Sequence, residues 1–347
     1  MHIAVIIPAY NAAAWLADCL VSLRRQTYLD WSAIVVDDGS TDGTASVVDD
    51  AEPDGRISVV RQANAGVSAA RNHGIRIALG RTGGQRADAM LFLDADDWLS
   101  PDALSRLADG LDRAPWAVAA AGAHAFVQPD GQVVRAPLPP SGCLLDRLIV
   151  RNLFVNGGQL LICREAIESA GFFRPDLPFG EDWEYWTRLA ALGEFTVLKG
   201  RAPVLFAREH GESAYRRMAT DPHRAQAVVQ AIHANPDIRV RFGAATLAAL
   251  RKKADAESAW IIGREQIRHG QRRDGQRWLR RSLRQSPGAK RGVLLLLSPF
   301  GVGPFRPYRF WGKALPQGDT QWNAQCQMET QARPARSCPE GFATISP

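Results

Sequence analysis

The most constraining stretch of this 347-residue chain is 89–100, where a short apolar run is followed directly by three carboxylates. Residues 90–93 (Met-Leu-Phe-Leu) are typical of a strand that is buried on both faces. Asp94, Asp96 and Asp97 come next, and carboxylates so close together repel one another unless a cation lies among them. The stretch therefore predicts a metal site at the carboxyl end of a central parallel strand, where open α/β sheets bind their ligands.

Strand-like and helix-like segments alternate through the first third of the chain. The apolar patterns predict buried strands at 3–7, 33–36, 57–60 and 90–93, and helices at 12–25, 44–50, 66–79 and 101–111. Asn11 and Ser100 are the expected N-caps of the first and last of these helices. This alternation predicts an α/β fold with a mostly parallel sheet that helices cover on both faces.

The alternation weakens after residue 115, and the chain becomes helical and basic towards its end. Further strands are expected at 116–121 and 195–198, helices at 144–152 and 165–170, and a turn at 129–131. From Pro316 onward the sequence is polar, rich in Gln, Pro and Ser, and without a period. We expect a helical, basic C-terminal extension over 216–313 and a disordered tail over 314–347.

Four predicted loops follow four predicted strands, so their residues should meet at one edge of the sheet. This edge would hold Tyr10, Asp38, Arg71, Asp94 and Asp96. Together they suit a nucleoside diphosphate: the ring stacks on the base, and Asp38 accepts a hydrogen bond from a base N–H. Arg71 meets negative charge, and a divalent cation bridges the carboxylates to phosphate oxygens.

Each of these residues also has a plain structural interpretation. Asp94 and Asp96 fit a solvated loop, and Asp38 fits a turn former. Arg71 fits a surface charge on a helix, and Tyr10 fits a core residue. Both interpretations stay open on the sequence patterns taken one at a time.

Five motifs occur in order along the chain, at 5–11 (VIIPAYN), 35–44 (VVDDGSTDGT), 64–72 (NAGVSAARN), 92–97 (FLDADD) and 180–183 (GEDW). Together they resemble the family 2 glycosyltransferases, an inverting group with the GT-A fold. The resemblance covers residues 1–215, which it implies are the catalytic domain, with a Rossmann-like sheet flanked by helices.

The resemblance implies a nucleotide-sugar donor, with UDP as the expected nucleotide. The nucleotide pocket would include Pro8, Tyr10, Asp38 and Arg71. The acceptor would be a glycan or a lipid-linked sugar, in the assembly of surface polysaccharide or glycolipid.

The resemblance also implies a DXD-type motif at Asp94-Ala95-Asp96 that holds a divalent cation, Mg²⁺ or Mn²⁺. His210 would supply a further metal ligand or a phosphate contact. The implied catalytic base is Asp182 at the start of a helix, where the helix dipole favours the ionised carboxylate.

Several alternatives stay open. Glu181 competes with Asp182 for the role of base, and Trp183 and Trp186 fit either the acceptor site or the core. Nucleotidyl transfer and a non-catalytic sugar-nucleotide sensor are the alternative functions. Nucleotidyltransferases more often carry a Gly-rich loop after the first strand, where this chain has PAYNAAAWL.

The net charge of +6 is concentrated in the C-terminal extension. One interpretation is a solvated face of a helical subdomain. The other, which we favour, is peripheral contact with an anionic membrane, because apolar and aromatic residues at 293–311 follow the basic stretch. The run at 292–300 is too short to span a bilayer, and no nucleic-acid-binding module is matched.

The five cysteines are scattered, without a CxxC, which suggests neither a zinc site nor a disulfide framework. We therefore expect a cytoplasmic protein. In the second interpretation of the extension, the protein contacts the cytoplasmic face of the inner membrane.

Overall fold

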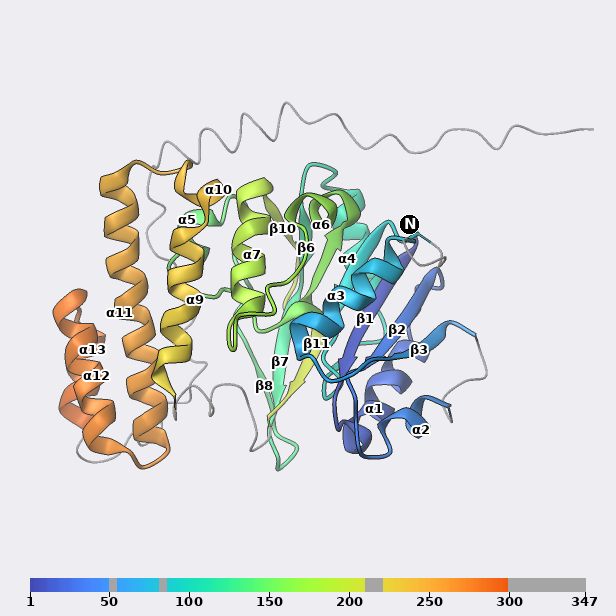
Figure 1. The fold of residues 1–347 in the computed structure, drawn as a ribbon, viewed down its shortest axis with the longest axis horizontal. Coiled ribbons are helices and arrows are strands. Elements are labelled where there is room, and N and C mark those ends of the chain that lie inside the picture. Colours follow the sequence, from blue (N-terminus) through green and yellow to red (C-terminus); the bar gives the residue numbers. More distant parts are fainter. Residues whose placement is uncertain (50–54, 81–85, 210–220, 299–347) are drawn as a thin grey trace, which may run out of the picture.

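The computed structural model describes residues 1–49, 55–80, 86–209 and 221–298 (Figure 1). A seven-stranded sheet lies at its centre, in the order β10-β6-β9-β4-β1-β2-β3. Its strands are β1 (Ile3–Ala9), β2 (Trp31–Asp37), β3 (Ile57–Arg61), β4 (Ala89–Phe92), β6 (Ala119–Ala121), β9 (Leu160–Cys163) and β10 (Phe195–Val197).

The sheet is mostly parallel, as predicted. β1 pairs in parallel with β2 and with β4, β2 pairs in parallel with β3, and β6 with β10. β9, which the sequence patterns did not predict, runs antiparallel between β4 and β6. Its four apolar residues are too few for periodicity to distinguish a strand from a piece of buried helix.

A second sheet has the order β5-β11-β7-β8 and was not predicted either. It contains β5 (Trp98–Leu99), β7 (Ala123–Val127), β8 (Val133–Arg135) and β11 (Pro203–Arg208). The expected turn at 129–131 joins β7 to β8 as an antiparallel pair. β5 pairs with β11, which connects the stretch after Asp97 to a strand more than a hundred residues further along the chain.

Helices cover both faces of the large sheet. They are α1 (Ala13–Arg24), α2 (Thr44–Asp49), α3 (Val67–Ala78), α4 (Ala103–Asp112), α5 (Leu145–Leu148), α6 (Arg164–Ala170) and α7 (Glu181–Leu192), with a 3₁₀ turn, η1 (Gly157–Gln159). Successive residues of β1 pack on opposite faces of the sheet. Ile6 belongs to the buried cluster that includes residues of α3 and α7, and Ile7 belongs to the one that includes residues of α1 and α4. The continuous apolar strands of the sequence follow from this two-sided burial.

Three local predictions were wrong. Asn11 does not cap α1; it adopts a positive φ of 49°, and its Oδ1 accepts a hydrogen bond from the Thr41 N–H. Ser100 does not cap α4, which begins at Ala103, because its hydroxyl bonds to Asp102 instead. The predicted helix at 144–152 is confined to α5, since residues 149–152 leave the helix as a turn.

The described part of the C-terminal extension, residues 221–298, is helical, as predicted. Its helices are α9 (Pro222–Ala234), α10 (Pro236–Arg239), α11 (Ala244–Arg268), α12 (Arg272–Gln285) and α13 (Ala289–Leu297). Val228 and Ile232 of α9 belong to the same buried cluster as α7, whereas α12 and α13 lie on the far side of α11 from the sheet (Figure 1). Among the described residues, no helix is long and apolar enough to cross a bilayer. The predicted tail lies outside them.

Candidate active site

The loops after β1 and β2 are joined by hydrogen bonds. The Asp38 N–H donates to the carbonyl of Ala9 at 2.8 Å, and the Asn11 N–H donates to Ser40 Oγ at 3.0 Å. Further along, the Ala12 N–H donates to Thr44 Oγ1 at 2.8 Å. The structure therefore brings two of the predicted loops to one edge of the sheet, as the parallel strands require.

Asp38 joins this pair of loops to a third. Its buried carboxylate accepts hydrogen bonds from Gln62 Nε2 at 2.7 Å, from the Ala65 N–H at 2.9 Å and from the Gly66 N–H at 2.8 Å. Gly66 directly precedes α3, so Asp38 holds the start of the helix that carries Arg71. A base N–H would have to use the acceptor capacity that these three donors leave.

Tyr10 lies on the surface of the same edge. Its side chain is 54% exposed, which excludes the interpretation of Tyr10 as a core residue. Pro8, at the end of β1, is half-buried beneath it. An exposed ring at the end of a parallel strand is available to stack on a base.

Arg71 of α3 is buried at the centre of the site, which excludes its interpretation as a surface charge. Its two terminal nitrogens each donate at 2.8 Å, one to Asp94 Oδ1 and the other to Glu181 Oε1. Burial alone would lower the pKa of this guanidinium, but Asp94 and Glu181 raise it above its ordinary value. Arg71 thereby connects the end of β4 to the start of α7.

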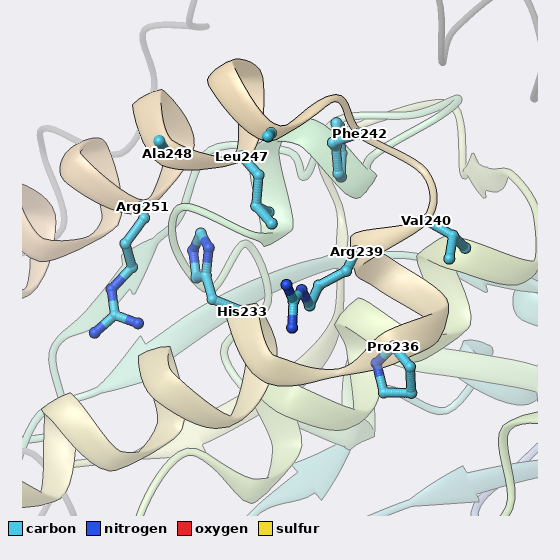
Figure 2. Close-up of a pocket in the computed structure, with 9 residues that line it drawn as sticks. His233, Pro236, Arg239, Val240, Phe242, Leu247, Ala248 and Arg251 are labelled. Atoms are coloured by element: carbon cyan, nitrogen blue, oxygen red, sulfur yellow. The ribbon is translucent and has the colours of Figure 1, made fainter.

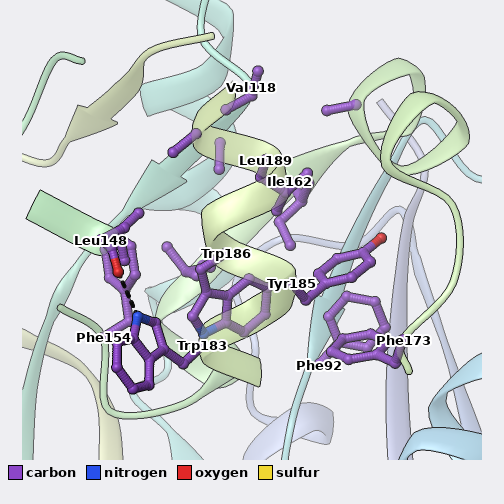
Figure 3. Close-up of a cluster of buried hydrophobic side chains, with 14 of the residues drawn as sticks. Phe92, Val118, Leu148, Phe154, Ile162, Phe173, Trp183, Tyr185, Trp186 and Leu189 are labelled. Atoms are coloured by element: carbon purple, nitrogen blue, oxygen red, sulfur yellow. Dashed lines mark hydrogen bonds between the residues drawn. The ribbon is translucent and has the colours of Figure 1, made fainter. Parts of the chain in front are cut away.

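Arg71 contacts a cluster of aromatic rings that includes Phe173, Tyr185 and Phe92, and Figure 3 shows these three rings grouped together. The guanidinium lies 5.3 Å from the ring of Phe173, which stacks on Tyr185 of α7 at 4.0 Å between ring centroids. Phe173 also meets Phe92 of β4 edge-on at 5.0 Å. The cluster packs α7 against β4 and so fixes the distance between their two groups of carboxylates.

Asp94 and Asp96 are half-buried at the end of β4. Burial raises the pKa of Asp94, and so does the charge of Asp96, while Arg71 acts in the opposite direction. Ala95 between them is buried and joins the core. Two neighbouring carboxylates that remain partly accessible fit a divalent cation.

Asp97 has a different environment. Its buried carboxylate accepts hydrogen bonds from Asn156 Nδ2 at 2.6 Å and from the Arg208 N–H at 2.8 Å. Burial raises the pKa of Asp97 well above its ordinary value. Asp97 thus fixes the loop against β11 and the residue before η1.

Asp182 lies in the first turn of α7, beside the charge pair of Arg71 and Glu181. Its Oδ1 accepts from the Trp183 N–H at 2.6 Å, and Asn152 Nδ2 donates to its Oδ2 at 3.3 Å. Burial, together with the charge of Glu181, raises the pKa of Asp182 to about 7. A carboxylate with such a pKa is matched to proton transfer near neutral pH.

Glu181 and the two tryptophans of α7 are less available to a substrate than Asp182. Glu181 is engaged by Arg71, so its charge already has a partner. Trp183 and Trp186 are core residues; Trp183 donates to the carbonyl of Leu148 (Figure 3). Of the two interpretations of these rings, the structure confirms the core.

The metal prediction rests on two of its three residues, because His210 lies outside the described residues. Within those residues, no group of three or more His, Cys, Asp or Glu side chains is arranged to hold a metal ion. Magnesium sites in enzymes of phosphate chemistry commonly use one or two carboxylates and complete their shell with substrate phosphates and water. Asp94 and Asp96 fit a site of that kind.

Comparison with known proteins identifies the fold at this site. Residues 4–169 match Glycosyl transferase family 2, a range that contains four of the five motifs. This segment, just under half of the chain, is similar to glycosyltransferase family 2. Glycosyltransferase GlyA of Streptococcus pneumoniae is 36% identical over 106 residues, which are 30% of this chain and 14% of GlyA. Chondroitin synthase of Escherichia coli is 33% identical over 108 residues, 31% of this chain and 15% of the synthase. The matched segments thus span about a seventh of these relatives.

Solved structures extend the likeness to the whole fold. S. aureus TarS 1-349 superimposes with a TM-score of 0.57 at 17% identity, covering 86% of this chain and 87% of that one. Mannosyltransferase PcManGT from Pyrobaculum calidifontis has a TM-score of 0.54 at 20% identity, covering 95% and 86%. The family 2 fold, with its large sheet flanked by helices, is the GT-A fold that the motifs predicted.

Sequence patterns missed several residues of the site. Asn72 fixes the segment under Arg71, because its amide exchanges two hydrogen bonds with the backbone of Phe173 at 2.7 and 2.8 Å. Asn156 and Asn152 contact Asp97 and Asp182. Asn72 ends a recognised motif and could have been found there, but the other two stand in a region with no motif.

Proposed function

We propose that this chain is an inverting glycosyltransferase that transfers a sugar from a nucleotide sugar to a glycan or lipid-linked acceptor. The observation that carries the proposal is the Arg71 bridge, with Asp94 on one of its nitrogens and Glu181 on the other. It places carboxylates of two chemical environments side by side: a half-buried pair after β4, and Asp182 with a pKa of about 7.

The base of the proposed reaction is Asp182. An acceptor hydroxyl must lose its proton as it attacks the anomeric carbon opposite the departing diphosphate. Asp182 receives that proton, and Asn152 holds the carboxylate in place. Glu181 keeps Arg71 charged and raises the pKa of Asp182, which makes Glu181 a positioning residue in this proposal.

We assign the binding of the nucleotide sugar to the side of Arg71 that carries Asp94. Tyr10 stacks on the base, and Pro8, Asp38 and Arg71 line the nucleotide and diphosphate. Asp94 and Asp96 would hold a divalent cation, which when bound offsets the negative charge on the leaving diphosphate.

The nature of the donor is supported by the structural neighbours. TarS 1-349 was solved with UDP-GlcNAc, and PcManGT with GDP-Man and Mn²⁺. We propose a nucleotide sugar, UDP-linked as first choice, together with Mg²⁺ or Mn²⁺. Chondroitin synthase among the relatives supports a role in polysaccharide assembly.

Donor binding gives the first test of these roles. Calorimetry with UDP-GlcNAc is expected to show binding that Mn²⁺ strengthens in the wild type. Asp96→Ala should weaken the Mn²⁺-dependent binding by more than about tenfold, because even an outer partner of a metal ligand is worth that much. Asp182→Asn should bind like the wild type.

Asp109→Ala provides a matched control, since Asp109 is an exposed carboxylate of α4. Unchanged Mn²⁺-dependent binding in Asp96→Ala would contradict the metal assignment. A wild type that binds the donor but transfers no sugar to any acceptor would favour the sensor over the enzyme.

We also propose peripheral contact between the extension and an anionic membrane. α12 exposes arginines along its length, and Val293 and Leu296 of α13 are 49% and 75% exposed. Full-length protein should sediment with phosphatidylglycerol vesicles at low salt and be released at high salt, because exposed charges are screened. Protein that stays in the supernatant at low salt would contradict this contact.

A further inference from the structure

A separate pocket lies in the C-terminal extension, between α9, α10 and the first half of α11 (Figure 2). It has a volume of about 660 Å³. Its lining combines cationic and apolar side chains and includes His233, Arg239, Phe242, Leu247 and Arg251. None of the described residues that line it is a carboxylate.

His233 presents a hydrogen-bond acceptor to this pocket. Its side chain is buried, with 8% exposed, and its Nε2 lies 3.1 Å from the carbonyl of Ile149. Because a carbonyl can only accept, Nε2 carries the hydrogen. Burial lowers the pKa of His233 to about 4, so the ring is neutral and Nδ1 has a free lone pair.

Nδ1 has no hydrogen-bond partner in the described part of the chain. Buried polar atoms are almost always paired, because an unpaired one loses its hydration without compensation. Figure 2 shows the His233 ring directed toward α11 and into the pocket. The pocket thus has an unpaired acceptor buried in its wall, which a ligand hydroxyl would reach by displacing the side chain that covers it.

Two arginines flank this acceptor from different elements (Figure 2). Arg251 of α11 donates from Nε to Asp255 Oδ1 at 3.2 Å, which orients the guanidinium and leaves its terminal nitrogens available. Arg239 of α10 is exposed, and its side chain makes no hydrogen bond or ion pair with the described residues. With His233 neutral and Asp255 offsetting part of the charge of Arg251, the positive charge of the pocket comes mainly from Arg239.

We propose that this pocket binds a hydroxylated anion, namely a polyol or sugar unit that carries a phosphate or carboxylate. Arg239 and Arg251 hold the anion, His233 Nδ1 accepts a hydrogen bond from a hydroxyl, and Phe242 and Leu247 cover the carbon chain. A simple anion would satisfy the arginines but not His233, and a neutral sugar would satisfy His233 but not the arginines.

The site is distinct from the proposed transfer centre but is connected to it through α9. Val228 of α9 packs so close to Gly180 that a side-chain carbon added there would lie 3.1 Å away. Gly180 directly precedes α7 and its two carboxylates. The pocket is therefore placed to hold a charged part of a long acceptor, but its binding is testable without donor, metal or transfer.

The test is calorimetry on the full chain at pH 8, with glycerol 3-phosphate as the probe. We expect saturable binding that Arg239→Gln weakens by about tenfold or more, the usual scale for a charge-assisted hydrogen bond. Arg201→Gln, which removes an exposed arginine between β10 and β11, should bind like the wild type. Arg239 is exposed and makes no contact that the fold needs, so equal melting temperatures should show that both variants are folded.

Methyl phosphate tests the role of His233, because it carries the same anion without a hydroxyl. We expect it to bind about fivefold or more weakly than glycerol 3-phosphate. Equal binding of the two probes, or equal binding by the wild type and Arg239→Gln, would overturn the proposal.

Phosphatidylglycerol vesicles distinguish a lipid headgroup from a soluble ligand, since they present the same hydroxyl and phosphate. Sedimentation that Arg239→Gln reduces and Arg201→Gln does not would assign the pocket to the headgroup. Soluble binding that depends on Arg239, with sedimentation that does not, would assign it to a soluble sugar or polyol. Independence from Arg239 in both assays would refute the pocket as a site.

Discussion

Replacing Asp182 with Asn is expected to lower the rate of sugar transfer by about 10²–10⁴-fold, the usual contribution of a positioned general base. The amide preserves the size of the side chain and can still accept from the Trp183 N–H, but it cannot take up a proton. Initial rates at saturating donor would measure the loss. Glu181→Gln is the companion variant, and a larger loss there than in Asp182→Asn would exchange the two roles.

The pH dependence of transfer follows from the same group. The pKa of Asp182 is raised to about 7, and the base acts in its ionised form. The rate should therefore rise with pH up to about 7 and then level off. A rate that is independent of pH between 5 and 8 would contradict Asp182 as the base.

Asp182→Asn should also stabilise the empty protein at pH 8. In the folded state the pKa of Asp182 is about 7, whereas its ordinary pKa is 3.8. Between pH 3.8 and about 7 the folded protein therefore binds more protons than the unfolded chain. Stability therefore falls as pH rises through that window. Removing the carboxylate should raise the free energy of unfolding by about 1 kcal/mol or more at pH 8, and by little at pH 4.

The second large effect is expected for Arg71→Met, which should destabilise the protein by about 3–5 kcal/mol. Methionine keeps much of the volume over Phe173 but leaves the carboxylates of Asp94 and Glu181 without their buried cation. Urea unfolding at pH 7.5 would measure the loss. Donor binding should be lost as well, since Arg71 connects the two halves of the site.

Arg86→Met is the matched control for Arg71→Met. The pair of Arg86 with Glu168 has a similar distance of 2.7 Å, but Arg86 is 56% exposed. Exposed pairs contribute about 1 kcal/mol or less. Equal destabilisation by the two variants would mean that burial of Arg71 does not determine its contribution.

Sequence patterns predicted the strands whose own residues already indicate a buried position in the sheet. The buried strands β1, β2 and β4 are long apolar runs with polar residues at one end, so both their type and their shared edge could be inferred. The convergence of Tyr10, Asp38 and the β4 carboxylates on that edge followed from parallel pairing alone.

The remaining features depend on contacts between distant residues. β9 and the second sheet are short runs whose strand character comes from their partners. The pairing of Arg71 with Glu181 joins residues 110 positions apart, which no local spacing indicates. Sequence alone does not separate Asp97 from Asp94 and Asp96, because the partners that give it a different role, Asn156 and Arg208, are visible only in the fold.

The hydrogen bond from Arg71 to Asp94 affects how a metal ion and a nucleotide would bind at the site. Oδ1 of Asp94 is engaged by the guanidinium, so a cation would gain one oxygen from this residue and would meet a positive charge close by. A diphosphate would complete the coordination shell of the cation and neutralise the guanidinium together. Metal and nucleotide are then thermodynamically linked: the factor by which Mn²⁺ tightens the nucleotide equals the factor by which the nucleotide tightens Mn²⁺.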